Sequence, residues 1–247
     1  MDIICGDCRD ELPKLQPGSI DLIVTDPPYG ETSLDWDCWP CGWLDLLPRL
    51  LAPHASVWMF GSQRMFIEHA PEFAAAGFRV VQDLVWEKHN GSSLSNDRFR
   101  RVHEHAVQFC PVGRRWDEIY KRPLFTHDAV ARTVRRKARP AHWGEIGEGD
   151  FRSDDGGPRL MRSVMCARSE HGRALHPTQK PLSVLLPLIE YSSSPGALVL
   201  DPFGGAGSTA LACKRSGRDC ILVEGRPYYV DVAMRRLDGD EPLFRAV

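Results

Sequence analysis

Residues 197–237 alternate between apolar runs and helical patterns, and this alternation restricts the fold more than any other feature of the sequence. The runs 197–201 and 220–224 are typical of buried strands, and each ends in a carboxylate. A glycine-rich turn and a helical pattern over 208–216 separate them, and a second helical pattern follows over 227–237. Strands that alternate with helices predict a mostly parallel sheet with helices on both faces. Ligands of such sheets bind at the carboxyl ends of the strands.

The rest of the chain shows similar elements on either side of an irregular middle. Apolar runs predict strands over residues 19–25, 55–60, 78–86 and 105–109, and helical spacing predicts helices over 43–51, 63–76 and 181–191. Pro71 must kink a helix or begin one, because proline lacks the N–H that a helix interior needs. Pro181 suits a first helical turn, and Gly217 suits a helix end. Apart from the run 105–109, residues 91–174 give no confident element.

Length and composition indicate one globular α/β domain. The chain has 247 residues, of which 43% are apolar and 26% charged, and this profile excludes a disordered, collagen-like or coiled-coil protein. No apolar run approaches the roughly 18 residues that a membrane helix needs. Residues 1–7 lack the basic flank and apolar segment of a secretory signal. Eight cysteines without such a signal predict a reduced, cytoplasmic protein that has no membrane partner.

Two cysteine pairs keep a metal site open as an alternative. Cys5 and Cys8 have CxxC spacing, and so do Cys38 and Cys41. Four thiolates would suit a structural zinc ion. However, Cys5 ends a strand-like run and Cys8 begins a helical one, so neither pair forms a compact knuckle. The sequence therefore favours a protein without a metal.

Charge is distributed unevenly along the chain, although the formal net charge is only −2. Residues 97–140 contain 12 Lys or Arg against 5 Asp or Glu, and residues 159–180 contain 5 against a single Glu. The rest of the chain is consequently acidic. A basic face on an acidic body indicates a polyanionic partner. A solvated loop with scattered arginines is the plainer alternative.

The turn that follows Asp201 has the chemistry of a nucleotide-type site. Gly204, Gly205 and Gly207 allow the backbone to approach a ligand beside the unpaired N–H groups of a helix start. Glu224 ends the next strand, where an acid suits a ribose diol. The Gly-Lys-Ser/Thr ending of a phosphate-binding Walker loop is missing. Tight packing between strand and helix explains such glycines about equally well.

A second loop, Asp26-Pro27-Pro28-Tyr29, follows the apolar run 19–25. Two consecutive prolines stiffen the backbone, so that Asp26 and the Pro27 carbonyl can both accept hydrogen bonds from one NH₂ group. Tyr29 offers a flat face on which a base can stack. The loop therefore fits an exocyclic amine on a heteroaromatic ring. Taken alone, the tripeptide Asp26-Pro27-Pro28 is also a common turn at the start of a helix.

Together these segments resemble the β-type amino-methyltransferases of DNA, which modify adenine N6 or cytosine N4. The tetrapeptide 26–29 is similar to their catalytic motif, and residues 201–207 are similar to their S-adenosylmethionine motif. Residues 176–181 resemble the segment that holds the methionine end of this cofactor, and residues 6–8 resemble the strand end that meets its adenine. Two further family segments match residues 85–91 and 103–109. The resemblance covers nearly the whole chain and is weakest over residues 110–170.

This resemblance implies a single Rossmann-like methyltransferase domain with a circularly permuted motif order. Residues 1–110 would form the catalytic half of this domain, and residues 175–247 would form its cofactor-binding half. Residues 111–174 would be an irregular basic insertion that recognises the target. The residues implied to be catalytic are Asp26, Pro27, Pro28 and Tyr29. Those implied to bind S-adenosylmethionine are Asp7, Cys8, His176, Thr178, Gln179, Lys180, Asp201, Phe203, Gly204, Gly205, Gly207, Ser208, Thr209 and Glu224. Those expected to contact DNA are Arg98, Arg100, Arg101, Arg132, Arg135, Arg136, Lys137 and Arg139.

The reaction implied by the resemblance is direct methyl transfer from S-adenosylmethionine to N6 of a flipped adenine in double-stranded DNA. Cytosine N4 is the alternative target, and a non-catalytic nucleic-acid-binding module is the alternative class. No nuclease constellation is evident in the sequence. Family members often form dimers, although nothing in the sequence itself indicates a homodimer. Trp36 and Trp39 follow the catalytic loop, and they either close over it or belong to the core.

Overall fold

A computed structural model describes residues 1–92, 96–136, 148–170, 172 and 174–240. The chain divides into two compact units. The first unit comprises Met1–Arg122 and Ser163–Val247, and it contains an eight-stranded sheet. The second unit, Pro123–Arg162, contains two small two-stranded sheets.

The large sheet is mostly parallel, as the sequence predicts. Its strand order is β1-β12-β11-β2-β3-β5-β4-β10. The neighbouring strands from β1 to β3 pair in parallel, whereas β5 runs antiparallel to both β3 and β4, and β10 is parallel to β4. The strands are β1 (Asp2–Cys5), β2 (Ile20–Thr25), β3 (Leu51–Gly61), β4 (Phe78–Ser92), β5 (Arg101–Pro111), β10 (Val164–Ala167), β11 (Leu198–Asp201) and β12 (Asp219–Glu224).

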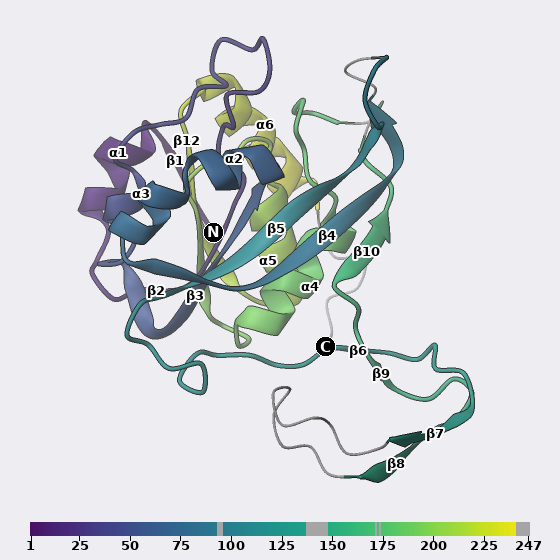
Figure 1. Cartoon of the computed structure of the whole chain (residues 1–247). Helices are drawn as coiled ribbons and strands as arrows, with labels where there is room; N and C mark the ends of the chain where they lie inside the picture. Colours follow the sequence, from purple (N-terminus) through teal and green to yellow (C-terminus); the bar gives the residue numbers. More distant parts are fainter. Residues whose placement is uncertain (93–95, 137–147, 171, 173, 241–247) are drawn as a thin grey trace. The chain divides into compact units, whose positions relative to one another are not determined.

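Helices cover both faces of this sheet (Figure 1). One face carries α1 (Cys8–Glu11), α2 (Gln63–Glu68) and α3 (Ala70–Ala75), and the other carries α4 (Leu182–Ser192), α5 (Ser208–Ser216) and α6 (Pro227–Asp238). Two short 3₁₀ helices, η1 (Leu12–Lys14) and η2 (Leu44–Leu46), contribute Leu12 and Leu44 to the core under the first face. Among the helices of the described residues, none is long and apolar enough to cross a membrane.

The chain order brings the carboxyl ends of distant strands to one edge of the sheet. Cys5 at the end of β1 lies opposite Glu224 at the end of β12. Asp201 at the end of β11 lies opposite Leu222. Because β2 also runs parallel to β11, the loop after Thr25 emerges at the same edge. The fold thus places the acids of the predicted motifs close together.

Local signals for helix ends predict some elements well. Helix α5 covers the predicted range 208–216, and Gly217 ends it in the left-handed conformation that glycine adopts without strain (φ 70°). Pro71 lies in the first turn of α3, so it begins a helix rather than kinking one. Pro181 precedes α4 as its N-cap.

The prediction of a helix over 43–51 is wrong. Only η2 forms there, and Leu51 already begins β3. Pro48 explains the difference, because a proline in the middle of a helix removes one hydrogen bond and its ring clashes with the preceding turn. Leu44, Leu47 and Leu50 are nevertheless buried, so the apolar spacing is satisfied by a compact irregular segment.

The second unit contains structure that the sequence does not predict. β6 (Phe125–Thr126) pairs antiparallel with β9 (Arg159–Leu160), and β7 (Arg132–Arg136) pairs antiparallel with β8 (Gly149–Ser153). These strands, together with β10, lie in the range 91–174, where the sequence gives no confident element apart from the run 105–109. The unit lies inside the range 111–174 that was predicted to recognise the target.

Candidate active site

A cavity of about 510 Å³ opens at the carboxyl ends of β1, β2, β11 and β12. Its size lies within the range of small-molecule sites, which is roughly 300–1,000 Å³. All four residues predicted to be catalytic line this cavity. Of the residues predicted to bind a cofactor, all except Gly207 line it as well. The fold therefore gathers the sequence motifs around one space.

The glycines of the turn after β11 are required mainly by packing. A Cβ on Gly204 would lie 1.9 Å from the Leu222 side chain, and one on Gly207 would lie 2.9 Å from Ala233. Gly207 also has a left-handed backbone (φ 75°) as the N-cap of α5. Gly205 differs, because its N–H donates a hydrogen bond to the Glu224 carboxylate at 2.8 Å. The turn thus allows close packing and also orients an acid.

Glu224 is held in place by two backbone donors. Its Oε2 accepts from the N–H of Gly205 and its Oε1 accepts from the N–H of Arg226, each at 2.8 Å. Burial raises the pKa of this carboxyl above its ordinary value, although both hydrogen bonds oppose the shift. Glu224 is therefore an oriented acceptor at the wall of the cavity.

Asp7 and Asp201 lie at the two neighbouring strand ends. Asp7 caps α1 by accepting from the N–H of Arg9 at 2.8 Å, and it also forms an ion pair with the Arg9 guanidinium. Asp201 is buried and accepts from the N–H of Phe203 at 3.1 Å. Burial raises the pKa of Asp201 to about 6.

Asp26 is the acid of the loop predicted to be catalytic, and both of its oxygens have donors. The Tyr29 hydroxyl donates to Oδ1, and the Lys180 ammonium donates to Oδ2. Its side chain is 16% exposed. Burial raises the pKa of Asp26, whereas the contact with Lys180 favours the ionised form. Lys180, which was predicted to hold the cofactor, thus lies directly against the predicted catalytic carboxylate.

Two carboxylates at or beside the site are not indicated by the sequence as contributors to it. Asp37 is buried and accepts four backbone hydrogen bonds, from Tyr29, Gly30, Glu31 and Thr32, at 2.7–3.0 Å. Although burial opposes its charge, these hydrogen bonds hold the pKa of Asp37 below its ordinary value. The second residue is Glu104 on β5, whose carboxylate lies 3.3 Å from the Lys180 ammonium.

The segment before α4 contributes aromatic and polar groups to the cavity wall. The His176 ring lies against Trp36 and Tyr229, with centroid distances of 5.2 and 4.3 Å. Burial, with the nearby Lys180 and Arg226 charges, lowers the pKa of His176 to about 4, so the ring is neutral at pH 7. The Gln179 side chain accepts from the N–H of Leu175 at 2.9 Å.

Trp36 and Trp39, which had two open interpretations, differ in their surroundings. The Trp39 ring stacks on His69 with centroids 4.0 Å apart, and its Nε1–H donates to Glu72 at 2.9 Å. It therefore packs against α3 and its N-cap. Trp36 contacts His176 instead. Both tryptophans line the cavity, so neither is simply a core residue.

The alternative of a zinc site finds no support in the described residues. Across those ranges, no three His, Cys, Asp or Glu side chains are placed so that they could hold a metal ion. Cys5, Cys38 and Cys41 are exposed as free thiols, while Cys8 is buried.

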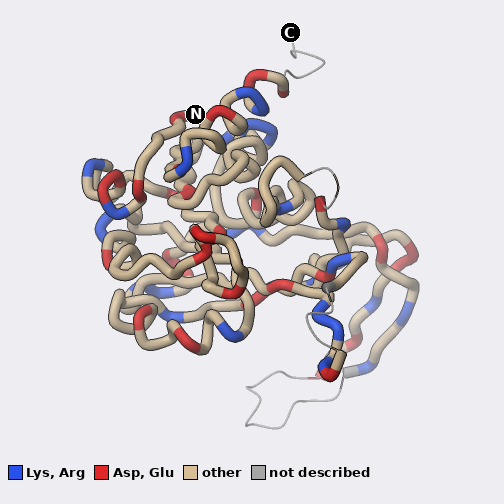
Figure 2. The backbone as a smooth tube through the Cα atoms, turned by 90° about the horizontal axis from the view of Figure 1, so that it is seen from above, with Lys and Arg blue, Asp and Glu red and all other residues tan. Residues whose placement is uncertain are grey.

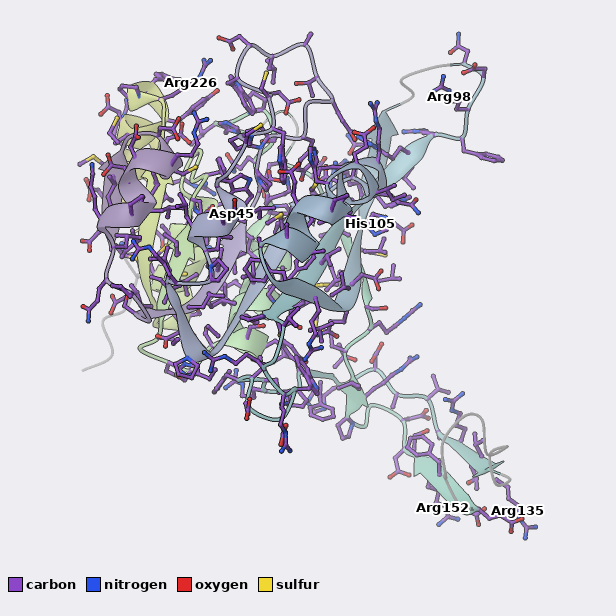
Figure 3. All side chains as sticks on the ribbon, turned by 60° about the vertical axis from the view of Figure 1, so that its left-hand side comes forward. Asp45, Arg98, His105, Arg135, Arg152 and Arg226 are labelled. Carbon is purple, nitrogen blue, oxygen red and sulfur yellow. The ribbon has the colours of Figure 1, made fainter. Side chains whose placement is uncertain are left out.

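The arginines predicted to contact DNA belong to both units. In the first unit, Arg98 is 82% exposed beside Asp97, Arg100 donates to the Gly91 carbonyl, and Arg101 forms an ion pair with Glu31 at 3.0 Å. Figure 2 shows basic and acidic residues interspersed along the backbone of this unit. In the second unit, Arg132 and Arg135 are exposed on β7, and Arg152 is exposed on the paired strand β8 (Figure 3). Lys137, Arg139 and the side chain of Arg136 lie outside the described part of the chain.

Comparisons with known proteins agree with this geometry. The family model N6_N4_Mtase, described as DNA methylase, matches residues 20–235. The Type II methyltransferase M.HinfI of Haemophilus influenzae is 28% identical over 268 residues, which are 97% of this chain and 69% of that protein. The solved M1.HpyAVI–SAM complex has a TM-score of 0.63 and 24% identity, covering 96% of this chain and 99% of that one. The cytosine-N4-specific PvuII DNA methyltransferase has a TM-score of 0.65 and 16% identity, covering 95% and 85%.

Proposed function

The chain belongs to the N6_N4_Mtase family of DNA methylases, and within this family we propose that it methylates the exocyclic N6 of adenine in double-stranded DNA. The observation that carries this proposal is the Asp26 carboxylate, which Tyr29 and Lys180 hold at the wall of a cavity. The methyl donor is S-adenosylmethionine, whose sulfonium supplies an activated methyl group when it is bound. The remaining steps depend on side chains of this chain.

Several independent observations support the binding of this cofactor in the cavity. Glu224 presents an oriented carboxylate that would accept hydrogen bonds from a ribose diol. Asp201 supplies a buried carboxylate suited to the cationic amino group of the methionine part. Phe203 and Trp36 supply apolar surface for the adenine ring and the carbon chain. Glu224, Asp201 and Phe203 would therefore hold the donor.

The catalytic loop would act on the target amine through hydrogen bonds. The lone pair of an exocyclic amine is delocalised into the ring, so the nitrogen is a poor nucleophile. Asp26 and the Pro27 carbonyl would accept its two N–H groups, which favours a pyramidal nitrogen and stabilises the positive charge that develops on it. Holding nitrogen, methyl carbon and sulfur in line supplies much of the remaining acceleration. No covalent intermediate with the protein is needed.

A base inside a duplex cannot reach this loop, so the target must be flipped out at a cost of a few kcal/mol. Stacking on the Tyr29 ring would recover part of this cost. A purine offers a larger face for stacking than a pyrimidine, and this supports adenine as the target. Cytosine N4 remains the second candidate, because the N4-specific PvuII enzyme has a closely similar fold.

The test of the proposal is the chemical identity of the product. DNA incubated with the protein and S-adenosylmethionine should yield N6-methyladenine when its nucleosides are separated and analysed by mass spectrometry. A product that contains N4-methylcytosine alone would overturn the choice of base but not the family. The Asp26→Ala variant serves as the control for contaminating activity.

Replacing Glu224 by alanine should weaken S-adenosylmethionine binding by about 1–3 kcal/mol, because buried ribose hydroxyls would lose a charged acceptor. Calorimetric titration measures the dissociation constant directly. Asp231→Ala, which removes an exposed carboxylate from α6, is the matched control and should leave binding unchanged. Equal affinity of the Glu224→Ala variant and the wild type would remove Glu224 from the cofactor site.

The exposed arginines of the second unit are proposed to contact phosphates. Replacing Arg132 and Arg135 together by alanine should weaken binding to all duplexes alike, because lysines and arginines that neutralise phosphates release condensed counterions. The slope of log affinity against log salt should become shallower by up to about 2. Fluorescence anisotropy at several salt concentrations measures both quantities. Arg64→Ala on α2 is the control, and an unchanged slope in the double variant would place the DNA elsewhere.

A further inference from the structure

The Lys180 ammonium is buried between two carboxylates, and the proposed reaction uses only one of them. Its side chain is 6% exposed. One contact is with Asp26, a second is with Glu104 at 3.3 Å, and a third is with the Thr178 carbonyl at 3.3 Å. An ammonium has three N–H donors. Two hydrogen bonds, to Asp26 and to the Thr178 carbonyl, and the ion pair with Glu104 therefore hold the side chain from three sides.

Glu104 connects Lys180 to a further charged residue, Lys88. It lies on β5, and its second oxygen contacts the Lys88 ammonium on the neighbouring strand β4. Lys88 in turn lies over the Trp86 ring at 4.7 Å from the centroid. Negative and positive groups thus alternate from Asp26 through Lys180 and Glu104 to Lys88. The charges of these four residues balance.

We propose that Glu104 is a positioning residue, which holds Lys180 against Asp26 and thereby makes Asp26 a stronger acceptor for the proton of the target amine. This inference rests on the proposed function, because it assigns a role within the methyl-transfer step. The effect of Glu104 follows from the charges before and after that step.

As the target nitrogen gains the methyl carbon, the electron pair of the broken C–S bond stays on sulfur, and one amine proton passes to Asp26. Asp26 then becomes neutral. With Glu104 present, Lys180 still has a negative partner, so protonation of Asp26 leaves a neutral buried pair. Without the Glu104 charge, the same protonation would leave a buried ammonium without a compensating carboxylate, which is strongly unfavourable.

The electrostatics of the cluster agree with this role. Although burial opposes its charge, the Lys180 and Lys88 ammonium groups lower the pKa of Glu104 to about 2, so this carboxylate is ionised at neutral pH. Although burial opposes its charge as well, the two carboxylates raise the pKa of Lys180. The titratable groups that face Asp26 are Tyr29 from its own loop, Lys180 before α4, Glu104 from β5 and Asp201 from β11.

Two substitutions should move the pH dependence of methyl transfer in opposite directions. Glu104→Gln removes a negative charge but keeps an oxygen that can accept from Lys180. It should slow single-turnover transfer by about 10- to 100-fold and move the acid limb of the rate profile to lower pH. Lys88→Met removes a positive charge from the far end of the chain of contacts and should move the acid limb to higher pH. Because the Lys88 side chain is 24% exposed, Lys88→Met is expected to fold, and it tests the proposal even if Glu104→Gln does not fold.

A double-substitution cycle tests whether Glu104 acts through Lys180. In the Lys180→Met background, the further change Glu104→Gln should slow transfer by less than about threefold, because Lys180 is no longer there to be positioned. Calorimetry should give S-adenosylmethionine dissociation constants within about twofold of wild type for Glu104→Gln. Asp83→Asn, an exposed carboxylate on β4, is the matched control and should change neither rate nor profile.

The outcomes separate this inference from the proposed function. A wild-type protein that produces no N6-methyladenine contradicts the proposed function. A wild-type protein that methylates adenine, combined with a Glu104→Gln variant of unchanged rate and pH profile, overturns the role of Glu104 alone. Equal losses from Glu104→Gln in the wild-type and Lys180→Met backgrounds would also overturn it, because they would mean that Glu104 acts independently of Lys180.

Discussion

Replacing Asp26 by alanine is expected to slow methyl transfer to DNA by at least about a thousandfold while S-adenosylmethionine binding is retained. The carboxylate is proposed to accept an N–H group of the target amine and then its proton, and alanine can do neither. Lys180 would also lose its partner beside the cavity. Transfer of a labelled methyl group under single-turnover conditions measures the loss, and calorimetry measures cofactor affinity.

Two further variants serve as comparisons for the Asp26→Ala rate. Asp26→Asn keeps an acceptor oxygen but removes the charge, so its rate should lie between those of the wild type and the alanine variant. Asp45→Ala removes an exposed carboxylate from η2 and should leave the rate unchanged (Figure 3). Substantial transfer by Asp26→Ala would contradict the catalytic role of Asp26, whatever the result for asparagine.

Replacing Asp37 by alanine should disorganise the loop 26–32, which contains the proposed catalytic residues, and slow methyl transfer by about 100-fold. The carboxylate accepts four backbone N–H groups between Tyr29 and Thr32, and the variant leaves these donors without a partner. An unsatisfied buried donor costs about 1–3 kcal/mol. Hydrogen exchange of these four amides should therefore become faster, which mass spectrometry of the corresponding peptide detects.

A control for this variant lies in the same loop. Asp35 is exposed and forms an ion pair with Arg226, and such surface pairs contribute little. Asp35→Ala should therefore leave amide exchange at residues 29–32 unchanged.

Because the pKa of Asp37 is lowered, the stabilising effect of the Asp37 carboxylate on the loop is complete at neutral pH and is lost as the pH falls through that lowered value. Unchanged exchange in Asp37→Ala at pH 7 would show that the loop is held by other contacts.

The sequence predicts those parts of the fold that short-range chemistry determines. The run 197–201, the helix 208–216 and the glycine at 217 each have a local physical signal, and the structure contains all three. The helix predicted over 43–51 fails because spacing alone does not account for Pro48. The strands of the second unit are short and largely exposed, so their sequences carry little of the apolar alternation on which strand prediction depends.

The residues of the candidate site also divide into those that a local sequence signal indicates and those that it does not. Asp26, Tyr29 and Glu224 belong to contiguous motifs, so residue type and spacing indicate them. Asp37 belongs to no such motif, and Glu104 lies in the matched segment 103–109 without any indication of its role, because the importance of both acids comes from partners that the fold supplies. Asp37 faces backbone groups five to eight residues before it, and Glu104 meets Lys180 only because β5 lies near the start of α4. Only three-dimensional contacts reveal these two acids.

The pairing of β1 with β12 has a consequence for how the enzyme matures during synthesis. Asp2 lies opposite Ile221, so the first strand has no neighbour until more than 200 further residues have been translated. The N–H of Gly6 likewise donates to the Glu224 carbonyl at 3.0 Å. A nascent chain on the ribosome therefore cannot complete the wall of the cavity until β12 has emerged. Prematurely terminated products that lack β12 would also lack Glu224, the acid proposed to hold the ribose of the methyl donor.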